Sequence, residues 1–421
     1  MRYILHSDLN NFYASVECMY NPTIRNSAVI VVGDSEKRHG IVLAKNNIAK
    51  SHEIKTGDTI WEAKLKCQNV VPVKARFEVY QKVSKKVKSM YREYTDQMES
   101  FGIDEAWLDI THRVKSWDEA VALANEIRKR VIDEIGITVS IGVSFNKVFA
   151  KLGSDLKKPN ATTLISDTNY KEIVWKQPVE EMIYIGSRTK AKLNKNNIFT
   201  LGDLANTSEH FMSLLIGKVG VMLRHMARGE DEMPVKWADD KEPVKSISNS
   251  TTCPRDLKRE SEVKGIIFIL AESVAERMRR EGFWAKDVSL IIKDSTLNYQ
   301  GWQKKLEFST NLAGDIANAC VELFKNYDWS TTVRAVGVRV SNWDSGQAQM
   351  NLFYDTSAHE KREKLECVVE NLRDRWGYDI IKRGVVVADK DMVELNPYSE
   401  IHAIHPISFL KGAILNGETE S

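Results

Sequence analysis

The sequence predicts an α+β protein of several domains, and three observations support this. Residues 1–165 follow the order strand, helix, strand pair, helix, strand, which is typical of an antiparallel or mixed sheet with helices on one face, of the ferredoxin-like kind. Residues 166–235 have helical patterning throughout, and a second α+β pattern follows at about 243–341. A chain of 421 residues also exceeds one ordinary core, so two to four compact units are expected.

The composition is that of an ordinary globular chain, with 43% hydrophobic and 28% charged residues and no low-complexity tract. The first residues, MRYILHSDLN, reach an aspartate too early for a secretory segment, and the longest apolar stretch, GIIFILA, is too short to span a membrane. The five cysteines are scattered without metal-ligand spacing, which predicts reduced thiols. We therefore expect a cytoplasmic protein that does not associate with membranes.

The charge of the chain is unevenly distributed. A formal net charge of +2 and a pI near 8.1 do not identify a nucleic-acid binder, because phosphate contacts depend on local charge. Residues 342–421 contain nine Lys+Arg and fourteen Asp+Glu, a net charge of −5, which leaves +7 for residues 1–341. The main body is therefore the basic part.

The first half of the chain places three acids at junctions between elements. YILHSD is predicted to be a buried strand and NNFYASVECMY a helix, so Asp8 lies where strand gives way to helix. Short strands and helices in residues 20–72 indicate a small insertion. After a helix over about 79–94, SFGIDEAWLDI reads as a strand pair with Asp104 and Glu105 near its turn, followed by a helix over 120–132 and the closing strand ITVSIGVSF.

The second half begins with helices that end at glycines and at Pro234. The polar linker ADDKEPVKS precedes two long helices, at about 260–281 and 312–326, which separate strands such as DVSLIIKD and TTVRAVGVRVSN. A last helix is predicted at about 359–376. Its apolar residues recur at a helical interval: Leu365, Val368, Val369, Leu372 and Trp376.

Asp8, Asp104 and Glu105 are candidates for metal-dependent phosphoryl transfer. Two divalent ions about 4 Å apart can activate a 3′-hydroxyl and neutralise a triphosphate if carboxylates on rigid elements hold them. Taken singly, Asp8 is better explained as a helix cap and the Asp104-Glu105 pair as solvated turn acids. The apolar neighbours of the pair argue against full solvation, and buried adjacent carboxylates require a counter-charge.

Three segments resemble, in order and spacing, the signature segments of the bacterial Y-family, or translesion, DNA polymerases: DLNNFYASVE, GIDEAWLDI and SIGVSFNKVFAKLGSDLKKPNATT. The similarity continues through IGSRTKAKL, GDLAN, KSISNSTTCPRD and VRAVGVRVSNW to about residue 343. It implies a template-directed DNA polymerase of low fidelity that extends a primer 3′ end by two-metal-ion phosphoryl transfer, in translesion synthesis and DNA repair. Whether the chain belongs to the DinB-like or the UmuC-like branch stays open.

The resemblance also implies the right-hand domain organisation of this family. The palm would comprise 1–19 and 73–165, the small fingers 20–72, and the helical thumb 166–240. An α+β little finger that binds DNA would comprise 243–341, and a C-terminal tail with one helix 342–421.

The resemblance assigns roles to individual residues. Asp8 and Asp104 would bridge two Mg²⁺ ions, Glu105 would hold the catalytic ion, and the Leu9 carbonyl would complete the nucleotide-side site, with Mn²⁺ as a substitute. Phe12 and Tyr13 would form the aromatic pair under the incoming sugar, with Tyr13 as the steric gate against a 2′-hydroxyl. Lys158 would bind the triphosphate. Lys147 and Lys151 are weaker candidates for this role, expected to be solvated.

The chain departs from the family pattern at several positions. Asn47 and Lys50 stand where a tyrosine and an arginine usually contact the triphosphate, so Lys50 would reach a phosphate without bidentate geometry. Asn10 replaces a frequent aspartate that is not a bridging ligand. Tyr184 replaces one glycine of the helix-hairpin-helix motif, in which Gly186 would offer its backbone N–H to a DNA phosphate.

Further DNA contacts are expected on the strands of the second α+β region. Their polar faces would follow a phosphate backbone without reading bases, although an ordinary solvated sheet face is a serious alternative. The residues concerned are Ser246, Ser248, Ser250, Arg334 and Arg339.

A short motif after these strands, Gln349-Met350-Asn351-Leu352-Phe353, resembles the Q-x-x-L-F peptide by which bacterial polymerases bind the sliding clamp. Gln349, Leu352 and Phe353 would make the contacts, although the peptide could instead dock on its own protein. The expected partners are thus primer-template DNA, deoxynucleoside triphosphates and the clamp, for a monomeric enzyme.

Two alternatives from other classes fit these residues less well. A catalytically silent relative that binds DNA and the clamp as a scaffold is disfavoured by the intact Asp8, Asp104, Glu105, Tyr13 and Lys158. A nucleotidyl cyclase could use similar carboxylates, but it has no use for a thumb, a little finger or a clamp peptide.

Overall fold

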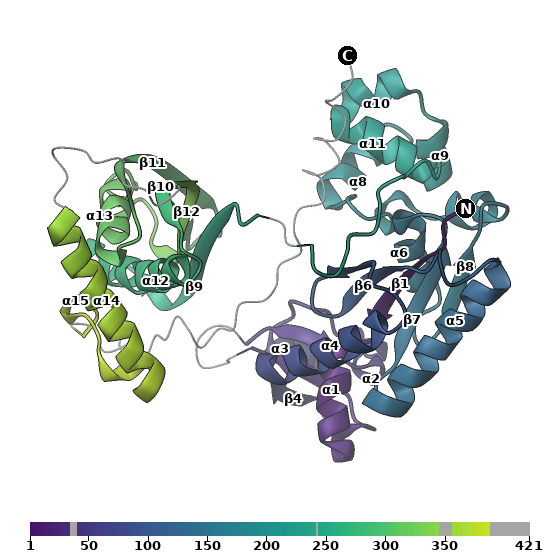
Figure 1. Ribbon diagram of the computed structural model, residues 1–421, viewed down its shortest axis with the longest axis horizontal. Coiled ribbons are helices and arrows are strands. Elements are labelled where there is room, and N and C mark those ends of the chain that lie inside the picture. Colours follow the sequence, from purple (N-terminus) through teal and green to yellow (C-terminus); the bar gives the residue numbers. More distant parts are fainter. Residues whose placement is uncertain (34–39, 241–242, 345–355, 388–421) are drawn as a thin grey trace. The chain divides into compact units, whose positions relative to one another are not determined.

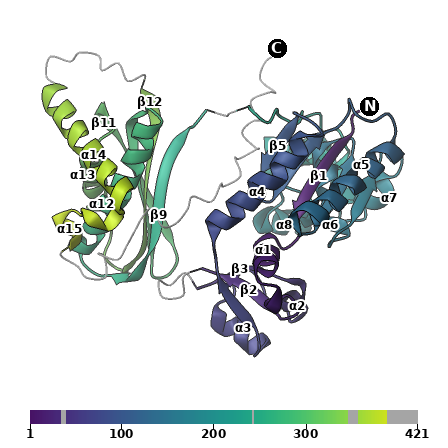
Figure 2. The same ribbon diagram turned by 60° about the horizontal axis from the view of Figure 1, so that its bottom comes forward.

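The computed structural model describes residues 1–33, 40–240, 243–344 and 356–387, which form two compact units. The first comprises residues 1–33 and 41–240, and the second residues 243–344 and 356–387. Figures 1 and 2 show the helices and strands of each unit. None of the described helices is long and apolar enough to cross a membrane.

The first unit is built on a five-stranded sheet of order β5-β6-β1-β7-β8. All neighbours are antiparallel except β7 and β8, which are parallel. The strands are β1 (Ile4–Leu9), β5 (Met98–Phe101), β6 (Glu105–Asp109), β7 (Val139–Ser144) and β8 (Thr162–Ile165). The central strand β1 is buried along its whole length, so Asp8 is fixed by strands on both sides.

Helices cover both faces of this sheet, which corrects the expectation that they lie on one face. Leu5 and Leu9 of β1 point into a core shared with α4 (Phe77–Arg92) and α5 (Trp117–Arg130). On the opposite face, Ile4 packs with Ala150 of α6 (Lys147–Leu156). A strand alternates its side chains between faces, so Asp8, at an even position like Ile4, lies on the α6 side.

Helix α6 approaches the sheet closely because β7 offers a glycine. A Cβ atom at Gly142 would lie 1.8 Å from the Ala150 carbonyl oxygen, which no side chain tolerates. Asn146 caps the start of α6, because its side chain accepts a hydrogen bond from the Phe149 N–H. The helix and the lysines that it carries are thus held directly over β1 and β7.

Two smaller parts complete the first unit. A three-stranded sheet of order β3-β2-β4 has its own small core around Ile30, Val42 and Ala63. Its elements are β2 (Val29–Val32), β3 (Val42–Lys45), α2 (Asn47–Ser51), α3 (Ile60–Lys66) and β4 (Val71–Lys74), and α1 (Phe12–Tyr20) connects it to β1. The helical part contains α7 (Tyr170–Val174), α8 (Ser187–Asn194), α9 (Leu201–Asn206), α10 (Glu209–Ile216) and α11 (Lys218–Ala227).

The second unit packs helices on one face of a four-stranded antiparallel sheet of order β11-β10-β12-β9. The strands are β9 (Ser246–Leu257), β10 (Trp284–Asp294), β11 (Tyr299–Thr310) and β12 (Val333–Asp344). The core helices are α12 (Glu260–Arg280) and α13 (Ala313–Phe324), within two residues of their predicted bounds. Strand β12 continues to Asp344, beyond the boundary at 341 expected from the sequence.

Two later helices, α14 (Thr356–Trp376) and α15 (Gly384–Val387), also belong to the second unit. Val386 of α15 is 1% exposed and lies in the same core as α12. The sequence placed these residues in a tail after the last folded domain. The structure instead packs residues 356–387 onto that domain.

Candidate active site

The register of the central strands brings Asp8 and Glu105 side by side. Asp8 of β1 pairs directly with Glu105 of β6, and the Leu9 N–H donates to the Asp104 carbonyl oxygen at 3.1 Å. Asp104 itself lies in the turn between β5 and β6. The three acids named from the sequence thus lie at one end of adjacent strands, held by backbone hydrogen bonds.

Helix α4 holds the acidic turn from the other side. Ser84 and Lys88 are four residues apart on one face of the helix, and they donate to two consecutive carbonyl oxygens of the turn. The Ser84 hydroxyl bonds to the Ile103 oxygen, and the Lys88 Nζ bonds to the Gly102 oxygen at 2.8 Å. Burial lowers the pKa of Lys88 to about 8, against the opposing effect of Asp104. Sequence reasoning missed this pair, because the spacing of a serine and a lysine on one helix face does not indicate which distant groups they contact.

Two lysines neutralise the carboxylates. Lys158 Nζ lies 2.6 Å from Asp8 Oδ2 and 2.7 Å from Asp155 Oδ1. Lys151 Nζ lies 2.5 Å from Glu105 Oε2. Lys151 is therefore not the solvated residue that the sequence suggested, because the partly buried acid beside it attracts a cation.

Lys147 is a second correction. Its side chain is 4% exposed, pairs with Glu99 at 2.6 Å, and lies over the Trp107 ring at 4.7 Å from the centroid. The Trp107 indole N–H donates to the Lys147 carbonyl at 2.9 Å. Burial lowers the pKa of this lysine, against the opposing effect of Glu99. Lys147 thus serves the packing of α6 on the sheet and lies away from solvent.

His6, which the sequence reading did not single out, lies on the same face as Asp8. It is fully buried, its Nδ1 shares a 2.8 Å hydrogen bond with the Ser154 hydroxyl, and its Nε2 lies 3.4 Å from Glu105 Oε2. Burial, and then the charge of Lys151, lower the pKa of His6 well below its usual value. A neutral imidazole therefore lies beside Glu105, and its Nε2 has no hydrogen-bond partner among the described residues.

The acids carry more negative charge than their surroundings favour. Burial, followed by the charges of Glu105 and Asp8, raises the pKa of Asp104 to about 6. Burial also raises the pKa of Asp8, although Lys158 opposes this effect. An added cation stabilises the charged form of carboxylates whose pKa is raised in this way. Hard divalent ions prefer such oxygen ligands.

This donor set fits divalent metal ions, but its side chains are directed to lysines. Within the described ranges 1–33, 40–240, 243–344 and 356–387, no three His, Cys, Asp or Glu side chains are gathered so that they would hold a metal ion. The backbone brings the acids together, whereas Asp8 and Glu105 turn their oxygens toward Lys158 and Lys151.

The aromatic pair after β1 has one buried and one accessible member. Phe12 is 3% exposed, whereas Tyr13 is partly exposed and stacks on Tyr80 with ring centroids 4.3 Å apart. The Tyr80 hydroxyl donates to Glu17 at 2.6 Å, and Arg76 pairs with the same carboxylate at 2.6 Å. This network, which the sequence reading missed, fixes the ring on which Tyr13 rests.

The positions where the chain departs from the family pattern have defined partners. Asn10 is buried, and its Oδ1 accepts from the Asn160 N–H at 2.8 Å, which ties the turn after Lys158 to β1. Asn47 accepts from the Asn11 side chain at 2.9 Å at the start of α2. Lys50 is exposed on the same short helix.

The expected DNA contacts lie in separate places. Gly186 precedes α8 in the first unit, beside Tyr184, whose φ of 76° is of the kind that favours glycine. In the second unit, Ser248 pairs with Arg339 on neighbouring strands, and both are exposed on the sheet. Ser246 and Ser250 share that face of β9, while Arg334 lies at the bulge of β12. Gln349, Leu352 and Phe353 lie outside the described residues.

Two family models and several known proteins match most of this chain. Residues 7–155 match the model of the impB/mucB/samB family, and residues 244–352 match the model of its C-terminal domain. A DNA polymerase IV of Acetivibrio thermocellus is 46% identical over 394 residues, covering 93% of this chain and 99% of the relative. DNA polymerase IV 1 of Bacillus subtilis is 32% identical over 402 residues, covering 93% and 94%.

Two solved structures share the fold. A Y-family DNA polymerase chimera of Dbh and Dpo4 aligns with a TM-score of 0.72, and DinB from Sulfolobus solfataricus with a TM-score of 0.55. Each is 23% identical and covers 81% of this chain and 99% of its own length.

Proposed function

Since the chain belongs to the bacterial, DinB-type Y-family of DNA polymerases, we propose that Asp8, Asp104 and Glu105 are its catalytic carboxylates. The family, the α+β polymerase fold and the activity predicted from the sequence are confirmed, and the enzyme is a DNA-directed, translesion DNA polymerase. The scaffold and cyclase alternatives are thereby set aside. Membership of the family implies primer-template DNA and deoxynucleotides as ligands, and a general dependence on divalent metal.

The finer proposal is a site for two Mg²⁺ ions, with Mn²⁺ as a substitute. Asp8 and Asp104 would hold both ions. Glu105 would hold the catalytic ion, and the Leu9 carbonyl would hold the nucleotide-side ion. When bound, the ions would supply charge neutralisation and nucleophile activation at the transferred phosphoryl group. The observation that carries this assignment is the register pair of the buried Asp8 and the partly buried Glu105, each of which is paired with a lysine.

Other residues of the chain would orient the nucleotide. Lys158 would move from Asp8 to the triphosphate and balance charge there, and Lys50 and Asn47 at α2 would contact the same phosphates. Phe12 would support the sugar pocket from within the core, and the exposed edge of Tyr13 would face the sugar. Each of these residues would bind or orient the nucleotide, and none would form a covalent bond to it.

The domain assignment is part of this proposal. Residues 1–19 and 73–165 would form the palm, 20–72 the fingers, and 166–240 the thumb, which grips DNA through the Gly186 backbone. Residues 243–341 would form the little finger, with Ser246, Ser248, Ser250, Arg334 and Arg339 along the DNA backbone. The enzyme would act as a cytoplasmic monomer and bind the sliding clamp through Gln349, Leu352 and Phe353.

The test is primer extension with Mg²⁺ by Asp8→Asn and Glu105→Gln variants. We expect each to lose extension by about a thousandfold or more while binding primer-template nearly as well as the parent. Asp109→Asn is the matched control, because Asp109 lies on the same face at the other end of β6 and should leave extension unchanged. Substantial extension by either active-site variant would remove these carboxylates from the chemistry.

Clamp binding has its own experiment. Deleting residues 349–353 should weaken synthesis stimulated by a bacterial sliding clamp and leave basal synthesis intact. Equal stimulation of the deleted and parent chains would assign clamp contact to another segment.

A further inference from the structure

Helix α4 carries a stripe of polar side chains that faces the backbone of the candidate active site. Ser84, Lys88 and Tyr91 are spaced so that they lie on one face of the helix, and we call them the α4 polar stripe. Ser84 is 4% exposed and Tyr91 2%. The helix is firmly placed, because Val87 and Met90 are buried in the core that it shares with the sheet.

The turn that carries Asp104 has three consecutive carbonyl oxygens that each accept a hydrogen bond. Lys88 Nζ donates to the Gly102 oxygen at 2.8 Å, and the Ser84 hydroxyl donates to the Ile103 oxygen. The oxygen of Asp104 itself accepts from the backbone N–H at the end of β1 at 3.1 Å. Fixed carbonyls on rigid peptide planes leave the turn little freedom, so the direction in which the Asp104 side chain leaves the backbone is set.

Gly102 ties the conformation of this turn to the Asp104 carboxylate. Its φ of 74° lies in the left-handed region that favours glycine. A Cβ atom built there would lie 3.7 Å from Asp104 Oδ1, so the carboxylate lies close to the Gly102 backbone. A change in the turn would therefore displace the carboxylate.

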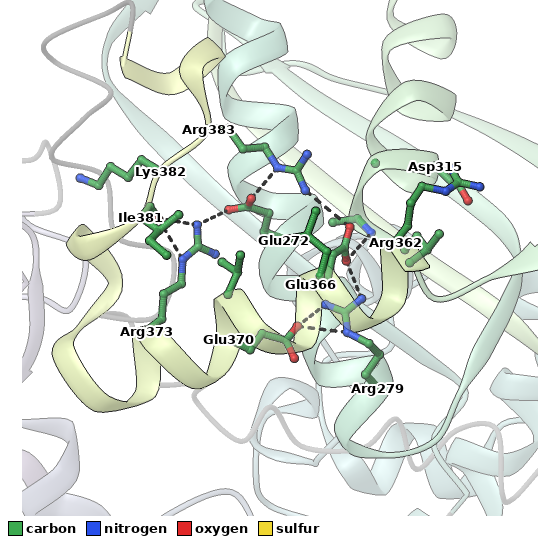
Figure 3. A pocket seen from close by; sticks show the side chains of 15 residues that line it. Glu272, Arg279, Asp315, Arg362, Glu366, Glu370, Arg373, Ile381, Lys382 and Arg383 are labelled. Atoms are coloured by element: carbon green, nitrogen blue, oxygen red, sulfur yellow. Dashed lines mark hydrogen bonds and ion pairs between the residues drawn. The ribbon is translucent and has the colours of Figure 1, made fainter. Parts of the chain in front are cut away.

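The hydrogen-bond partner of Lys88 differs from those of buried cations in the second unit. There Arg279 pairs with Glu366, and Arg373 pairs with Glu272 (Figure 3). Within the part of the chain that the structure describes, no carboxylate lies within ion-pair distance of the Lys88 ammonium, whose pKa burial lowers. A methionine would fill the same space without the cost of burying a charge, so packing does not explain a lysine here. A charged donor to a backbone carbonyl does explain it.

The same helix face reaches two other parts of the candidate site. The hydroxyls of Tyr91 and Ser7 share a hydrogen bond of 2.6 Å, and Ser7 directly precedes Asp8 on β1. One helical turn before Ser84, the Tyr80 ring stacks on Tyr13. Helix α4 thus contacts the backbone beside two of the acids and the ring that is proposed to face the sugar.

We propose that Ser84 and Lys88 are positioning residues for phosphoryl transfer, and that they fix Asp104 through the carbonyl oxygens of its turn. The inference rests on the proposed role of Asp104 as a catalytic carboxylate. A carboxylate that is held in place before the substrate arrives needs no rearrangement during the reaction, and a misplacement of about 1 Å can cost about a hundredfold in rate. Tyr91 would act on β1 in the same way.

Single-nucleotide insertion by Lys88→Met and by Ser84→Ala tests the proposal. Each should lower kcat by about tenfold or more, because orientation is lost. The KM for the deoxynucleotide and the Kd for primer-template should stay within about twofold of the parent, because binding contacts are kept. Lys85→Met, at an exposed lysine of the same helix, is the matched control and should behave like the parent. An unchanged kcat would overturn the proposal, and so would a raised KM or Kd at unchanged kcat, which would make these residues substrate contacts.

Residue-resolved hydrogen–deuterium exchange of the full-length protein gives a readout that does not depend on activity. The Leu9 N–H donates to the Asp104 oxygen, whereas the neighbouring Asn10 N–H donates to the Thr138 oxygen at 3.0 Å, outside the turn. In Lys88→Met, the Leu9 amide should exchange at least about tenfold faster than in the parent, and the Asn10 amide at the parent rate. Faster exchange of both amides would indicate a general loss of packing, and the parent rate at Leu9 would show a turn that does not need the lysine. Either result would overturn the proposal.

An Asp104→Asn variant separates failure of this inference from failure of the proposed function. Substantial extension by Asp104→Asn would show that the carboxylate is not catalytic, and the inference would fall with it. If Asp104→Asn loses extension while Lys88→Met and Ser84→Ala keep the parent kcat, only the positioning role is wrong. The double variant Asp104→Asn/Lys88→Met should lose no more than Asp104→Asn alone, because a positioning residue has no effect without the group that it positions. A further loss in the double variant would contradict action through Asp104.

Discussion

Lys158 Nζ lies 2.6 Å from Oδ2 of Asp8, so a proposed triphosphate ligand and a proposed metal ligand hold each other. Burial alone would lower the pKa of Lys158, but Asp8 and Asp155 raise it above its usual value. The lysine is therefore a permanent cation near the proposed point of phosphoryl transfer. A cation taken up by Asp8 would release it toward the nucleotide.

The first prediction concerns this lysine. Lys158→Gln should raise the KM for deoxynucleotides and lower kcat/KM by about ten- to a hundredfold, because one charge-assisted contact to the triphosphate is lost. Steady-state primer extension at varied nucleotide concentration measures it. Lys157→Gln, at the exposed neighbouring lysine, is the control and should behave like the parent. An unchanged KM for Lys158→Gln would restrict this residue to the Asp8 ion pair.

The sequence predicted the positions of the acids but not their electrostatic partners. Hydrophobic spacing located β1 and the β5–β6 turn, and the resemblance then singled out Asp8, Asp104 and Glu105. Lys151 was expected to be solvated, because nothing in its local sequence tells that α6 lies over the sheet beside Glu105. Contacts between distant segments, such as Lys88 with Gly102, depend on packing that single-sequence patterns do not contain.

Helix α14 shows that a sequence pattern can predict a helix without predicting which of its faces is buried. Its apolar spacing predicted the helix correctly, and on that pattern alone the stripe from Leu365 to Trp376 would face a core. The structure buries the charged face instead, because Arg279 and Glu272 of α12 are inside the contact and require partners. Periodicity identifies a helix, whereas the charges of the surface that it meets decide its rotation.

A second prediction concerns the packing of α6. Gly142→Ala should lower the free energy of unfolding by about 3 kcal/mol or more, because the new Cβ would overlap the Ala150 carbonyl and push α6 off the sheet. Chemical denaturation with a probe in the first unit measures it. Gly186→Ala, where nothing lies within 4 Å of the added carbon, should change stability by less than about 0.5 kcal/mol. Equal effects of the two substitutions would contradict the close approach of α6 to β7.

A third prediction concerns pH and the start of α12. Burial raises the pKa of Glu262, but hydrogen bonds outweigh this effect and hold the pKa at about 2. The donors are the Lys258 and Arg259 N–H groups and the Arg255 and Arg259 guanidinium groups. Because this pKa lies below the unfolded value of 4.5, Glu262 stabilises the second unit above pH 4.5. That contribution is lost as the pH falls from 4.5 toward 2.

Glu262→Gln should therefore lower the free energy of unfolding by on the order of 2 kcal/mol at pH 7. The difference in this free energy between variant and parent should shrink below pH 4.5. Urea unfolding of both chains at pH 7, 4 and 3 measures this. Glu260→Gln, at an exposed acid in the same first turn, should cost much less. A difference between parent and Glu262→Gln that does not vary with pH would show that shape, and not charge, is what the site requires.

The last prediction concerns sugar selection. Tyr13 stacks on Tyr80, whose hydroxyl donates to the Glu17 carboxylate with which Arg76 also pairs. In the proposed sugar pocket, this stack would oppose displacement of the Tyr13 ring by a 2′-hydroxyl. Tyr13→Ala should therefore raise the kcat/KM for ribonucleotides relative to deoxynucleotides by at least about tenfold, since a steric clash costs the transition state more than a missing contact. Single-nucleotide insertion with matched dNTP and rNTP measures the ratio. Tyr20→Ala, at an exposed tyrosine of the same helix, should leave it unchanged. If Tyr13→Ala keeps the parent ratio, discrimination lies elsewhere in the sugar pocket.

A Tyr80→Phe variant distinguishes the support of the Tyr13 ring from its contact with the sugar. It removes only the hydroxyl bond to Glu17, and it should raise the ratio partially if the rigidity of the stack matters.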